Sequence, residues 1–170
     1  MKKLLFIVFS LIASATFAQN DVTTIYIIRH AEQGAGEDAS LTEEGKDRTE
    51  KWGDYFEDKN ITTYYTTKHK RAIETVTGIS TFTSGIPQPG TSRQFVVKNY
   101  EGPEDLLLKQ VGEDHKGESV LIVGHSDTIH KYINILLETD KFTEIDEEEY
   151  GNLYIVTLRD GKPEIERLQM

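Results

Sequence analysis

Two apolar stretches of the chain each end in a histidine. Residues 24–28 (Thr-Ile-Tyr-Ile-Ile) run directly into Arg29 and His30, and residues 120–124 (Val-Leu-Ile-Val-Gly) run into His125. Runs of β-branched and aromatic residues are typical of buried strands. Ligands of open α/β sheets bind outside the carboxyl ends of the strands. We therefore expect both histidines at one edge of a single sheet, where they could form a two-imidazole site.

Two arginines are expected at the same edge. Arg29 follows the first strand, and Arg71 lies in the first turn of a helix that follows a second predicted strand, residues 61–66. Two guanidinium groups near one point repel each other unless an anion lies between them, and their forked donors match phosphate oxygens. The helix that begins beside His125 and Ser126 adds free backbone N–H groups and a positive dipole end. These features predict a pocket for a tetrahedral dianion.

Such a pocket suits phosphoryl transfer through histidine. A neutral imidazole can attack phosphorus and form a covalent phosphohistidine. The other imidazole, when protonated, can hold an equatorial oxygen and stabilise the charge of the transition state. Either histidine alone could be an ordinary residue at the edge of the core. The two arginines argue against this reading, because cations gathered at one sheet edge are costly without an anion.

The pattern of helices and strands predicts the architecture that positions these groups. Expected strands cover residues 24–28, 61–66, 94–98, 119–123, 153–158 and 164–168. Expected helices cover residues 43–58, a segment from about residue 70, a segment after Pro103, and residues 127–138. This alternation predicts an α/β three-layer sandwich, with a mostly parallel sheet and helices on both faces. The turn at Asp160-Gly161 predicts a C-terminal hairpin.

The first 18 residues resemble a secretory signal peptide. Two lysines precede an apolar core (residues 4–12), and small residues occupy the expected cleavage positions in the segment 16–18. The apolar core is too short to span a membrane. We expect residues 1–18 to be removed and residues 19–170 to form a single exported domain, periplasmic or secreted, without a membrane anchor.

The composition excludes several classes of function. The chain of 170 residues has no cysteine and a formal net charge of −10, so thiol nucleophiles and cysteine zinc sites are excluded. The negative charge argues against binding to nucleic acid or anionic membranes. His69, His115 and His130 have no partner at metal-ligand spacing and are predicted to be solvated, so no metal site is expected. No feature of the sequence indicates an oligomeric state.

Four segments resemble those of one family, the histidine phosphatase superfamily, which includes cofactor-dependent phosphoglycerate mutases, acid phosphatases and phytases. Arg-His-Ala-Glu at residues 29–32 is similar to the Arg-His-Gly signature of that family. Lys-Arg-Ala-Ile-Glu-Thr contains Arg71 at the place of the second arginine, and Val-Gly-His-Ser-Asp-Thr contains His125 at the place of the second histidine. Leu-Thr-Glu-Glu-Gly at residues 41–45 resembles a familiar spacer. The likeness spans residues 22–158.

The resemblance implies roles for these residues. His30 would carry the phosphohistidine, and Arg29, Arg71 and His125 would line the phosphate pocket, with Ser126 beside them. It also implies that neither a metal nor another cofactor takes part. One departure is Ala31, which replaces the usual glycine and is tolerable if the backbone there is not at positive φ.

The resemblance leaves the general acid open. Mutase-like members supply a glutamate from the segment between the second arginine and the second histidine, which favours Glu101. Phytase-like members use an aspartate directly after the second histidine, where this chain has Ser126, with Asp127 one residue later. Asp127 is also a good residue to cap the following helix. A third alternative is that no acid is present, which would leave a slow enzyme, because protonation of the leaving group is worth about 10²–10⁴-fold in rate.

The favoured function is an exported, metal-independent hydrolase of small phosphomonoesters that acts through a phosphohistidine on His30. About fifty residues separate Arg71 from His125, which leaves no room for a cap domain, so an open pocket is expected. One alternative is a binding protein that holds a phosphorylated ligand without turnover. Another is a phosphotransferase of the phosphoglycerate mutase type, although such enzymes need longer insertions.

Overall fold

The computed structural model describes residues 22–83, 96–100, 108, 111–159 and 162–170. Within these residues, the strands form one six-stranded sheet in the order β3-β2-β4-β1-β5-β6. The strands are β1 (Thr23–Arg29), β2 (Ile61–Thr66), β3 (Val96–Asn99), β4 (Ser119–Gly124), β5 (Asn152–Arg159) and β6 (Lys162–Gln169). The helices are α1 (Glu43–Phe56), α2 (Lys70–Thr83) and α4 (Ser126–Leu136).

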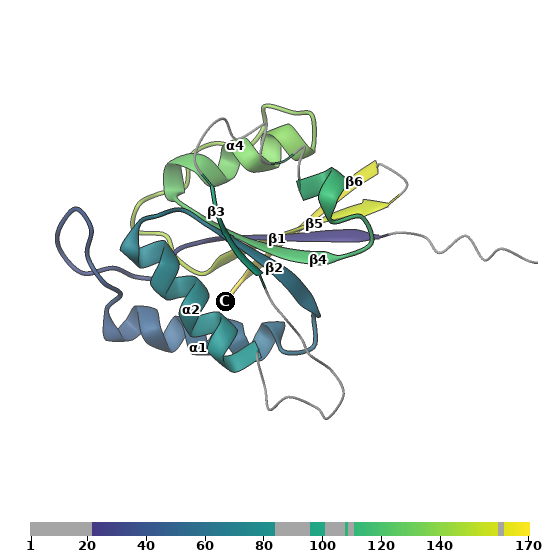
Figure 1. Cartoon of the computed structure of the whole chain (residues 1–170). Coiled ribbons are helices and arrows are strands. Elements are labelled where there is room, and N and C mark those ends of the chain that lie inside the picture. Colours follow the sequence, from purple (N-terminus) through teal and green to yellow (C-terminus); the bar gives the residue numbers. More distant parts are fainter. Residues whose placement is uncertain (1–21, 84–95, 101–107, 109–110, 160–161) are drawn as a thin grey trace, which may run out of the picture.

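The sheet is mostly parallel and is covered on both faces. The pairs β1–β4, β2–β4 and β2–β3 are parallel, while β5 runs antiparallel to β1 and forms a hairpin with β6. Figure 1 shows α1 and α2 on one face of the sheet and α4 on the other. The predicted three-layer α/β fold with a C-terminal hairpin is therefore confirmed. Most of the predicted loop at 83–93 and the start of the helix after Pro103 lie outside the described residues, and residues 111–114 are helical.

The continuous apolar pattern of β1 arises because both of its faces are buried. Ile25 and Ile27 pack in the cluster that includes the apolar side of α4, whereas Tyr26 and Ile28 pack with apolar side chains of α1 and α2. Successive side chains of a strand point to opposite faces, so a central strand between two helical layers needs no polar positions. Each large apolar side chain buried in this way contributes about 1.5–3 kcal/mol.

Strand register brings the two histidines to one edge of the sheet. Arg29 on β1 pairs with Gly124 on β4, and the backbone N–H of His30 donates to the carbonyl of Gly124 at 3.0 Å. His125 follows Gly124 directly, so the two strands end together with one histidine each. On the other side of β4, Thr66 at the end of β2 pairs with Val123, which brings the start of α2 to the same edge.

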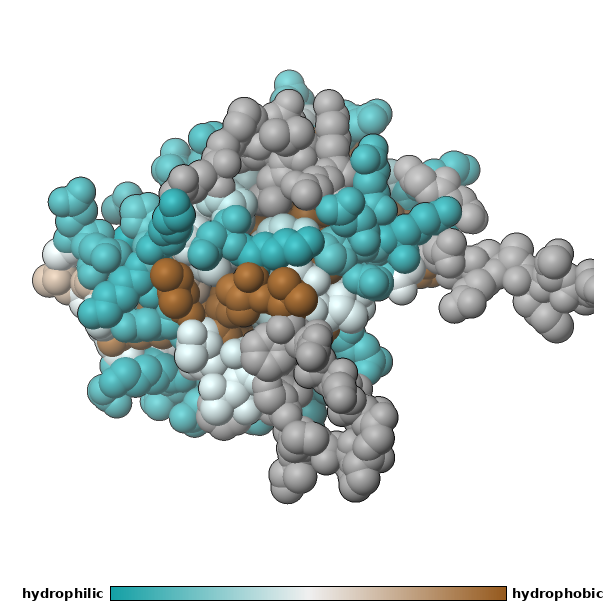
Figure 2. Space-filling view, in the orientation of Figure 1, coloured by the Kyte–Doolittle hydropathy of each residue, from teal (hydrophilic) through white to brown (hydrophobic). Residues whose placement is uncertain are grey.

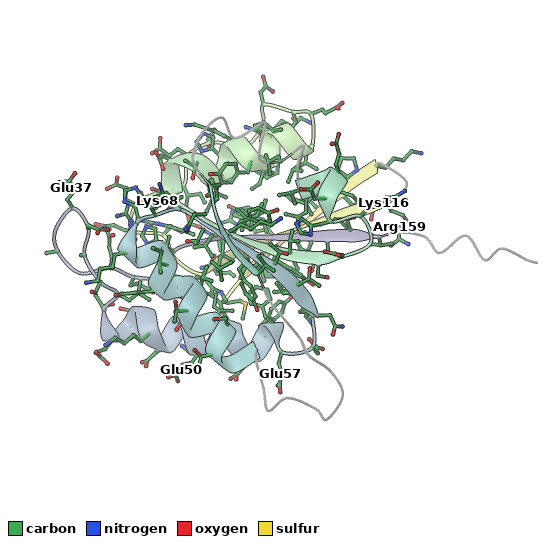
Figure 3. The ribbon with its side chains drawn as sticks, in the orientation of Figure 1. Glu37, Glu50, Glu57, Lys68, Lys116 and Arg159 are labelled. Carbon is green, nitrogen blue, oxygen red and sulfur yellow. The ribbon has the colours of Figure 1, made fainter. Side chains whose placement is uncertain are left out.

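The surface seen in Figure 2 is mostly hydrophilic, with a small apolar patch between polar side chains. Among the described residues, the exposed large apolar side chains are Ile73, Val96 and Val97. Charged side chains such as Glu50 on α1 and Glu57 directly after it point outward from the layers (Figure 3). No helix within the described ranges has the length and apolar character needed to cross a membrane.

Helix α1 supports the segment that follows His30. Thr42 caps the helix by accepting a hydrogen bond from the N–H of Gly45 at 3.1 Å, a role that threonine commonly fills. Gly45 is buried against the backbone of Glu32, and a Cβ atom at this position would lie 2.3 Å from the Glu32 carbonyl oxygen. The absence of a side chain therefore lets α1 approach the chain two residues after the candidate nucleophile.

We expect Gly45→Ala to lower the free energy of unfolding by about 1–3 kcal/mol, because the added methyl group collides with backbone that cannot rotate away. Urea unfolding monitored by circular dichroism measures this change. Gly112→Ala is the matched control, since a Cβ atom at this helical glycine meets nothing within 4 Å. Equal unfolding midpoints for the two variants would contradict a tight contact between α1 and the segment that carries Glu32.

Candidate active site

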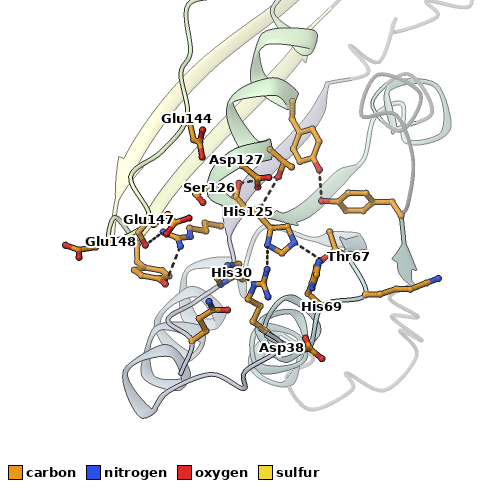
Figure 4. Close-up of a pocket in the computed structure, with 18 of the residues that line it drawn as sticks. His30, Asp38, Thr67, His69, His125, Ser126, Asp127, Glu144, Glu147 and Glu148 are labelled. Carbon is orange, nitrogen blue, oxygen red and sulfur yellow. Dashed lines mark hydrogen bonds between the residues drawn. The ribbon is translucent and has the colours of Figure 1, made fainter. Parts of the chain in front are cut away.

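A cavity of about 1100 Å³ opens at the carboxyl ends of β1, β2 and β4. It is lined by Arg29 at the end of β1 and His30 directly after it, by Arg71 from α2, and by His125 from the start of α4. These are the four groups that the sequence predicts to meet. Figure 4 shows His30 and His125 together with Glu144, Glu147 and Glu148 of the segment that precedes β5.

His30 is held as a neutral imidazole with one nitrogen free to react. Its side chain is only 3% exposed, and Nδ1 lies 2.8 Å from the carbonyl oxygen of Ala31. A carbonyl oxygen only accepts hydrogen bonds, so Nδ1 carries the proton and Nε2 carries the lone pair. Nε2 accepts a hydrogen bond from Nε of Arg71 at 3.1 Å. Burial, with further contributions from His125 and the arginines, lowers the pKa of His30 to about 3, which leaves Nε2 unprotonated at neutral pH.

His125 is the second neutral imidazole, and its ring centroid lies 5.2 Å from that of His30. Nη2 of Arg71 lies 3.4 Å from Nδ1, and the Thr67 hydroxyl lies 2.9 Å from Nε2. Because Arg71 can only donate, Nδ1 is the acceptor and Nε2–H donates to Thr67. Burial and the charge of Arg71 lower the pKa of His125 to about 4. This low pKa favours the neutral ring of His125 at neutral pH.

His125 also begins helix α4. It is the N-cap residue, its carbonyl accepts a hydrogen bond from the N–H of Thr128 at 3.1 Å, and its own N–H donates to the Thr128 hydroxyl at 3.1 Å. The prediction that Asp127 caps this helix is wrong by two residues, because Asp127 lies in the first turn. Asp127 is exposed and lines the cavity, and the buried Ser126 lines it as well. Helix α4 therefore directs its N-terminus toward the cavity.

Arg29 lies at the same edge but makes different contacts. Its side chain is 5% exposed, and Nη1 donates to the carbonyl oxygens of Asp146, Glu147 and Glu149 at 3.2, 2.6 and 3.1 Å. Nη2 donates to the hydroxyl of Tyr150 at 3.3 Å, and the guanidinium carbon lies 4.0 Å from the centre of the Tyr150 ring. Nε is buried without a hydrogen-bond partner. The Nη atoms of Arg29 thus hold the segment 146–150 against the cavity.

A short hydrogen-bond chain fixes the backbone beyond His30. The N–H of Ala31 donates to the hydroxyl of Thr75 on α2 at 3.0 Å, and this hydroxyl donates to the carbonyl of Arg71 at 2.7 Å. Ala31 is fully buried and is not at positive φ, so the replacement of glycine there causes no strain. The carboxylate of the next residue, Glu32, pairs with Arg48 on α1.

Several residues of the cavity were not predicted from the sequence, among them Thr67, Tyr150 and His69. Thr67 directly follows β2, so its place at the carboxyl edge could have indicated it. Tyr150 lies edge-on to His30, with 6.2 Å between the ring centroids, and nothing in its local sequence signals this contact. His69 is exposed, as predicted, but its ring packs edge-on against His125 at 5.0 Å and lines the cavity.

His115 is not solvated, and that prediction is wrong. It is buried, with Nε2 2.9 Å from the hydroxyl of Tyr65 and Nδ1 2.7 Å from the carboxylate of Glu118. The imidazole satisfies two polar groups within the protein, which explains its burial. His130, also predicted to be solvated, is half-buried on α4.

The favoured general acid, Glu101, lies outside the described residues. Tyr100, the residue before it, is described. Its N–H donates to the carbonyl of Thr66 at 3.1 Å and its hydroxyl to the carbonyl of Val123 at 3.2 Å. Among the described residues, no group of three or more His, Asp or Glu side chains is arranged to hold a metal ion.

Comparison with known proteins links this chain to one family. The sequence model of the histidine phosphatase superfamily (branch 1) matches residues 25–89, which include His30 and Arg71. No curated protein matches the chain significantly in sequence.

Several solved structures share the fold. YhfR of Bacillus stearothermophilus is 17% identical with a TM-score of 0.65, and the alignment covers 84% of this chain and 95% of that protein. The protein histidine phosphatase SixA in complex with tungstate is 16% identical with a TM-score of 0.65, over 86% and 96% of the two chains. The phosphoglycerate mutase of Bacillus anthracis is 16% identical with a TM-score of 0.61, over 88% and 93%.

The sequence match covers the first histidine and the second arginine, and the shared fold extends over most of the described chain. Both agree with the motifs that converge on the cavity. This chain is therefore similar in sequence to the histidine phosphatase superfamily over residues 25–89, and it shares its fold with the solved structures named above.

Proposed function

We propose that this protein is a phosphohydrolase that removes phosphate from small phosphomonoesters through a covalent intermediate on His30. The observation that carries this proposal is the state of His30: Nδ1–H is bound to the carbonyl of Ala31, and the lone pair of Nε2 faces Arg71 within an accessible cavity. An imidazole in this tautomer is ready to act as a nucleophile.

The reaction would proceed in two steps. Nε2 of His30 attacks phosphorus, the bond from phosphorus to the ester oxygen breaks, and the alcohol leaves after it takes up a proton. Water then attacks the phosphohistidine, the P–N bond breaks, and inorganic phosphate and neutral His30 are released. Arg71, which donates to both imidazoles in the free site, would turn its donors to the phosphoryl oxygens, and His125 would stabilise their charge once protonated.

The proton for the leaving alcohol would come from Glu101 or Asp127. Glu101 follows the firmly held Tyr100, and Asp127 lines the cavity as an exposed carboxyl group. The metal-independent mechanism follows from the same groups, since the two arginines and a protonated His125 supply the charge that a metal would otherwise provide.

Two other functions use the same cavity. A binding protein would hold the phosphorylated ligand without turnover, and a mutase would transfer the phosphoryl group of His30 to a second alcohol. The structural relatives include both a histidine phosphatase and a phosphoglycerate mutase. We favour hydrolysis because the cavity is open to water. We also propose that residues 1–18 direct export, which N-terminal sequencing of the protein from its native host would test.

His30→Ala should abolish release of p-nitrophenol from p-nitrophenyl phosphate, because no other group can form the phosphoenzyme. Arg71→Ala should lower kcat by about 10²–10³-fold through loss of transition-state charge stabilisation. His130→Ala is the matched control, since His130 on α4 does not line the cavity, and it should retain activity. No turnover by the unaltered protein between pH 4 and 8 would exclude hydrolysis, and loss of activity in EDTA would exclude the metal-independent mechanism.

Binding of tungstate, a dianion at neutral pH, should strengthen as the pH falls from 8 to 5. The free site has His125 neutral with a pKa of about 4, and a bound dianion favours its protonated form, so binding takes up a proton. The affinity should rise by up to about tenfold for each unit by which the pH falls, over the range in which every bound tungstate takes up one proton. Titration calorimetry in buffers of different ionisation enthalpy measures the uptake. His125→Gln should bind more weakly and remove the dependence, and a pH-independent affinity of the unaltered protein would contradict this linkage.

The general acid should be revealed by substrates with poor leaving groups. If Glu101 is the acid, Glu101→Gln should lower kcat/KM for alkyl phosphates by about 10²–10⁴-fold and have far less effect on p-nitrophenyl phosphate, whose leaving group needs little protonation. Asp127→Asn is the matched variant and should show a small, uniform effect. The opposite pattern would assign the general acid to Asp127. If neither variant selectively affects the alkyl phosphates, neither carboxyl group is the general acid.

A further inference from the structure

Thr67 lines the cavity and contacts one of its two imidazoles, but the reaction proposed above gives it no task. It directly follows β2 and is half-buried. Its hydroxyl lies 2.9 Å from Nε2 of His125 (Figure 4). The end of β2 is well anchored, because the buried Thr66 pairs with Val123 on β4 and donates its hydroxyl to the carbonyl of Thr67 at 3.1 Å. The Thr67 hydroxyl is therefore presented to the ring from a firmly held strand end.

In the empty cavity this hydroxyl accepts the proton of Nε2. The other ring nitrogen, Nδ1, lies 3.4 Å from Nη2 of Arg71, which can only donate. A neutral imidazole has a single N–H, so that proton stands on Nε2 and the oxygen of Thr67 is its acceptor. Arg71 thus covers the one nitrogen of His125 to which a second proton could be added.

A phosphoryl group would change this arrangement at Nδ1. It would draw the Nη2 donor of Arg71 to its own oxygens and leave the lone pair of Nδ1 facing negative charge. Two acceptors repel, and the repulsion ends when Nδ1 takes up a proton from solvent and donates it to a phosphoryl oxygen. The imidazolium then has two N–H groups, and the Nε2–H already has its acceptor in Thr67.

Protonation of His125 depends on the anion, because its surroundings in the empty cavity are unfavourable to positive charge. Burial is the largest cause that lowers its pKa to about 4. The charged and titratable groups that face the ring are Arg71, His69, Arg29, His30 and Asp127. Asp127 favours the protonated ring, whereas both arginines and His69 oppose it. A bound dianion supplies the negative charge that the protonated ring requires.

We propose that Thr67 is a positioning residue: it holds the Nε2 proton of His125, so that the proton taken up with the phosphoryl group joins Nδ1 and faces the phosphoryl oxygens. This inference rests on the proposed function and adds a residue to it. The proton balances over one cycle, because it comes from solvent when the anion binds. It returns to solvent when inorganic phosphate leaves and Arg71 donates to Nδ1 again.

Thr67→Val tests this role in turnover, because valine keeps the shape of threonine and removes the acceptor. A hydrogen bond to the charged ring is lost, so kcat/KM for p-nitrophenyl phosphate should fall by about 10- to 100-fold. Thr67→Ser restores the hydroxyl and should recover most of the activity. Thr77→Val is the matched control, since Thr77 is exposed on α2 and does not line the cavity. Equal kcat/KM for Thr67→Val and the unaltered protein would overturn the proposal.

The protonation state of His125 in the tungstate complex separates this role from a purely structural one. Nitrogen NMR at pH 6 measures it, with the signals of the ring identified by their absence from His125→Gln. We expect both ring nitrogens to carry protons in the complexes of the unaltered protein and of Thr67→Ser. In the complex of Thr67→Val we expect a neutral ring with its proton on Nδ1, and therefore no proton uptake by calorimetry.

Two NMR results would overturn the role of Thr67: a neutral His125 ring in the tungstate complex of the unaltered protein, or a doubly protonated ring in that of Thr67→Val. The failure of the proposed function looks different. If the unaltered protein does not hydrolyse p-nitrophenyl phosphate, hydrolysis is excluded, while the tungstate complexes still report on Thr67. If it hydrolyses the ester and Thr67→Val matches it in kcat/KM and in proton uptake, only the present inference is overturned.

Discussion

The candidate site depends on one guanidinium group shared by two buried imidazoles. Arg71 donates from Nε to His30 and from Nη2 to His125, and because it cannot accept, it fixes the tautomer of both rings. The proton of each ring must then lie on the other nitrogen, which finds an acceptor in the carbonyl of Ala31 or the hydroxyl of Thr67. Burial and nearby positive charge keep both rings neutral. A pocket of this kind has unused positive potential, which an anion can satisfy.

The two arginines of the site illustrate how burial directs the same side chain to different tasks. Arg71 is partly exposed at the start of α2 and faces the imidazoles, so it can turn toward a ligand. Arg29 is almost fully buried, and a buried guanidinium must satisfy its donors within the protein. It does so with the carbonyls of Asp146, Glu147 and Glu149. It thereby holds one wall of the cavity and adds positive charge, which also lowers the pKa of His30.

Several features of the site could be predicted because they depend on local pattern and sheet geometry. The apolar runs before His30 and His125 indicated parallel central strands, and such strands end at one edge. Contacts made at long range could not be predicted in this way. His115 appeared solvated because its burial depends on Tyr65, fifty residues away, and on Glu118, three residues later. Asp127 appeared to be a helix cap because residue preference cannot tell which of three neighbouring residues begins the helix.

The sequence by itself determined the alternation of strands and helices, the α/β class, and the identity of the four residues that meet at the sheet edge, because hydrophobic periodicity and strand ends are local properties. Only the tertiary structure decided the tautomer and charge of each imidazole, the different contacts of Arg29 and Arg71, and the place of Tyr150 beside His30. Those features arise from burial and from hydrogen bonds between residues far apart in the chain, such as Arg29 and Glu147, which lie next to each other only after folding.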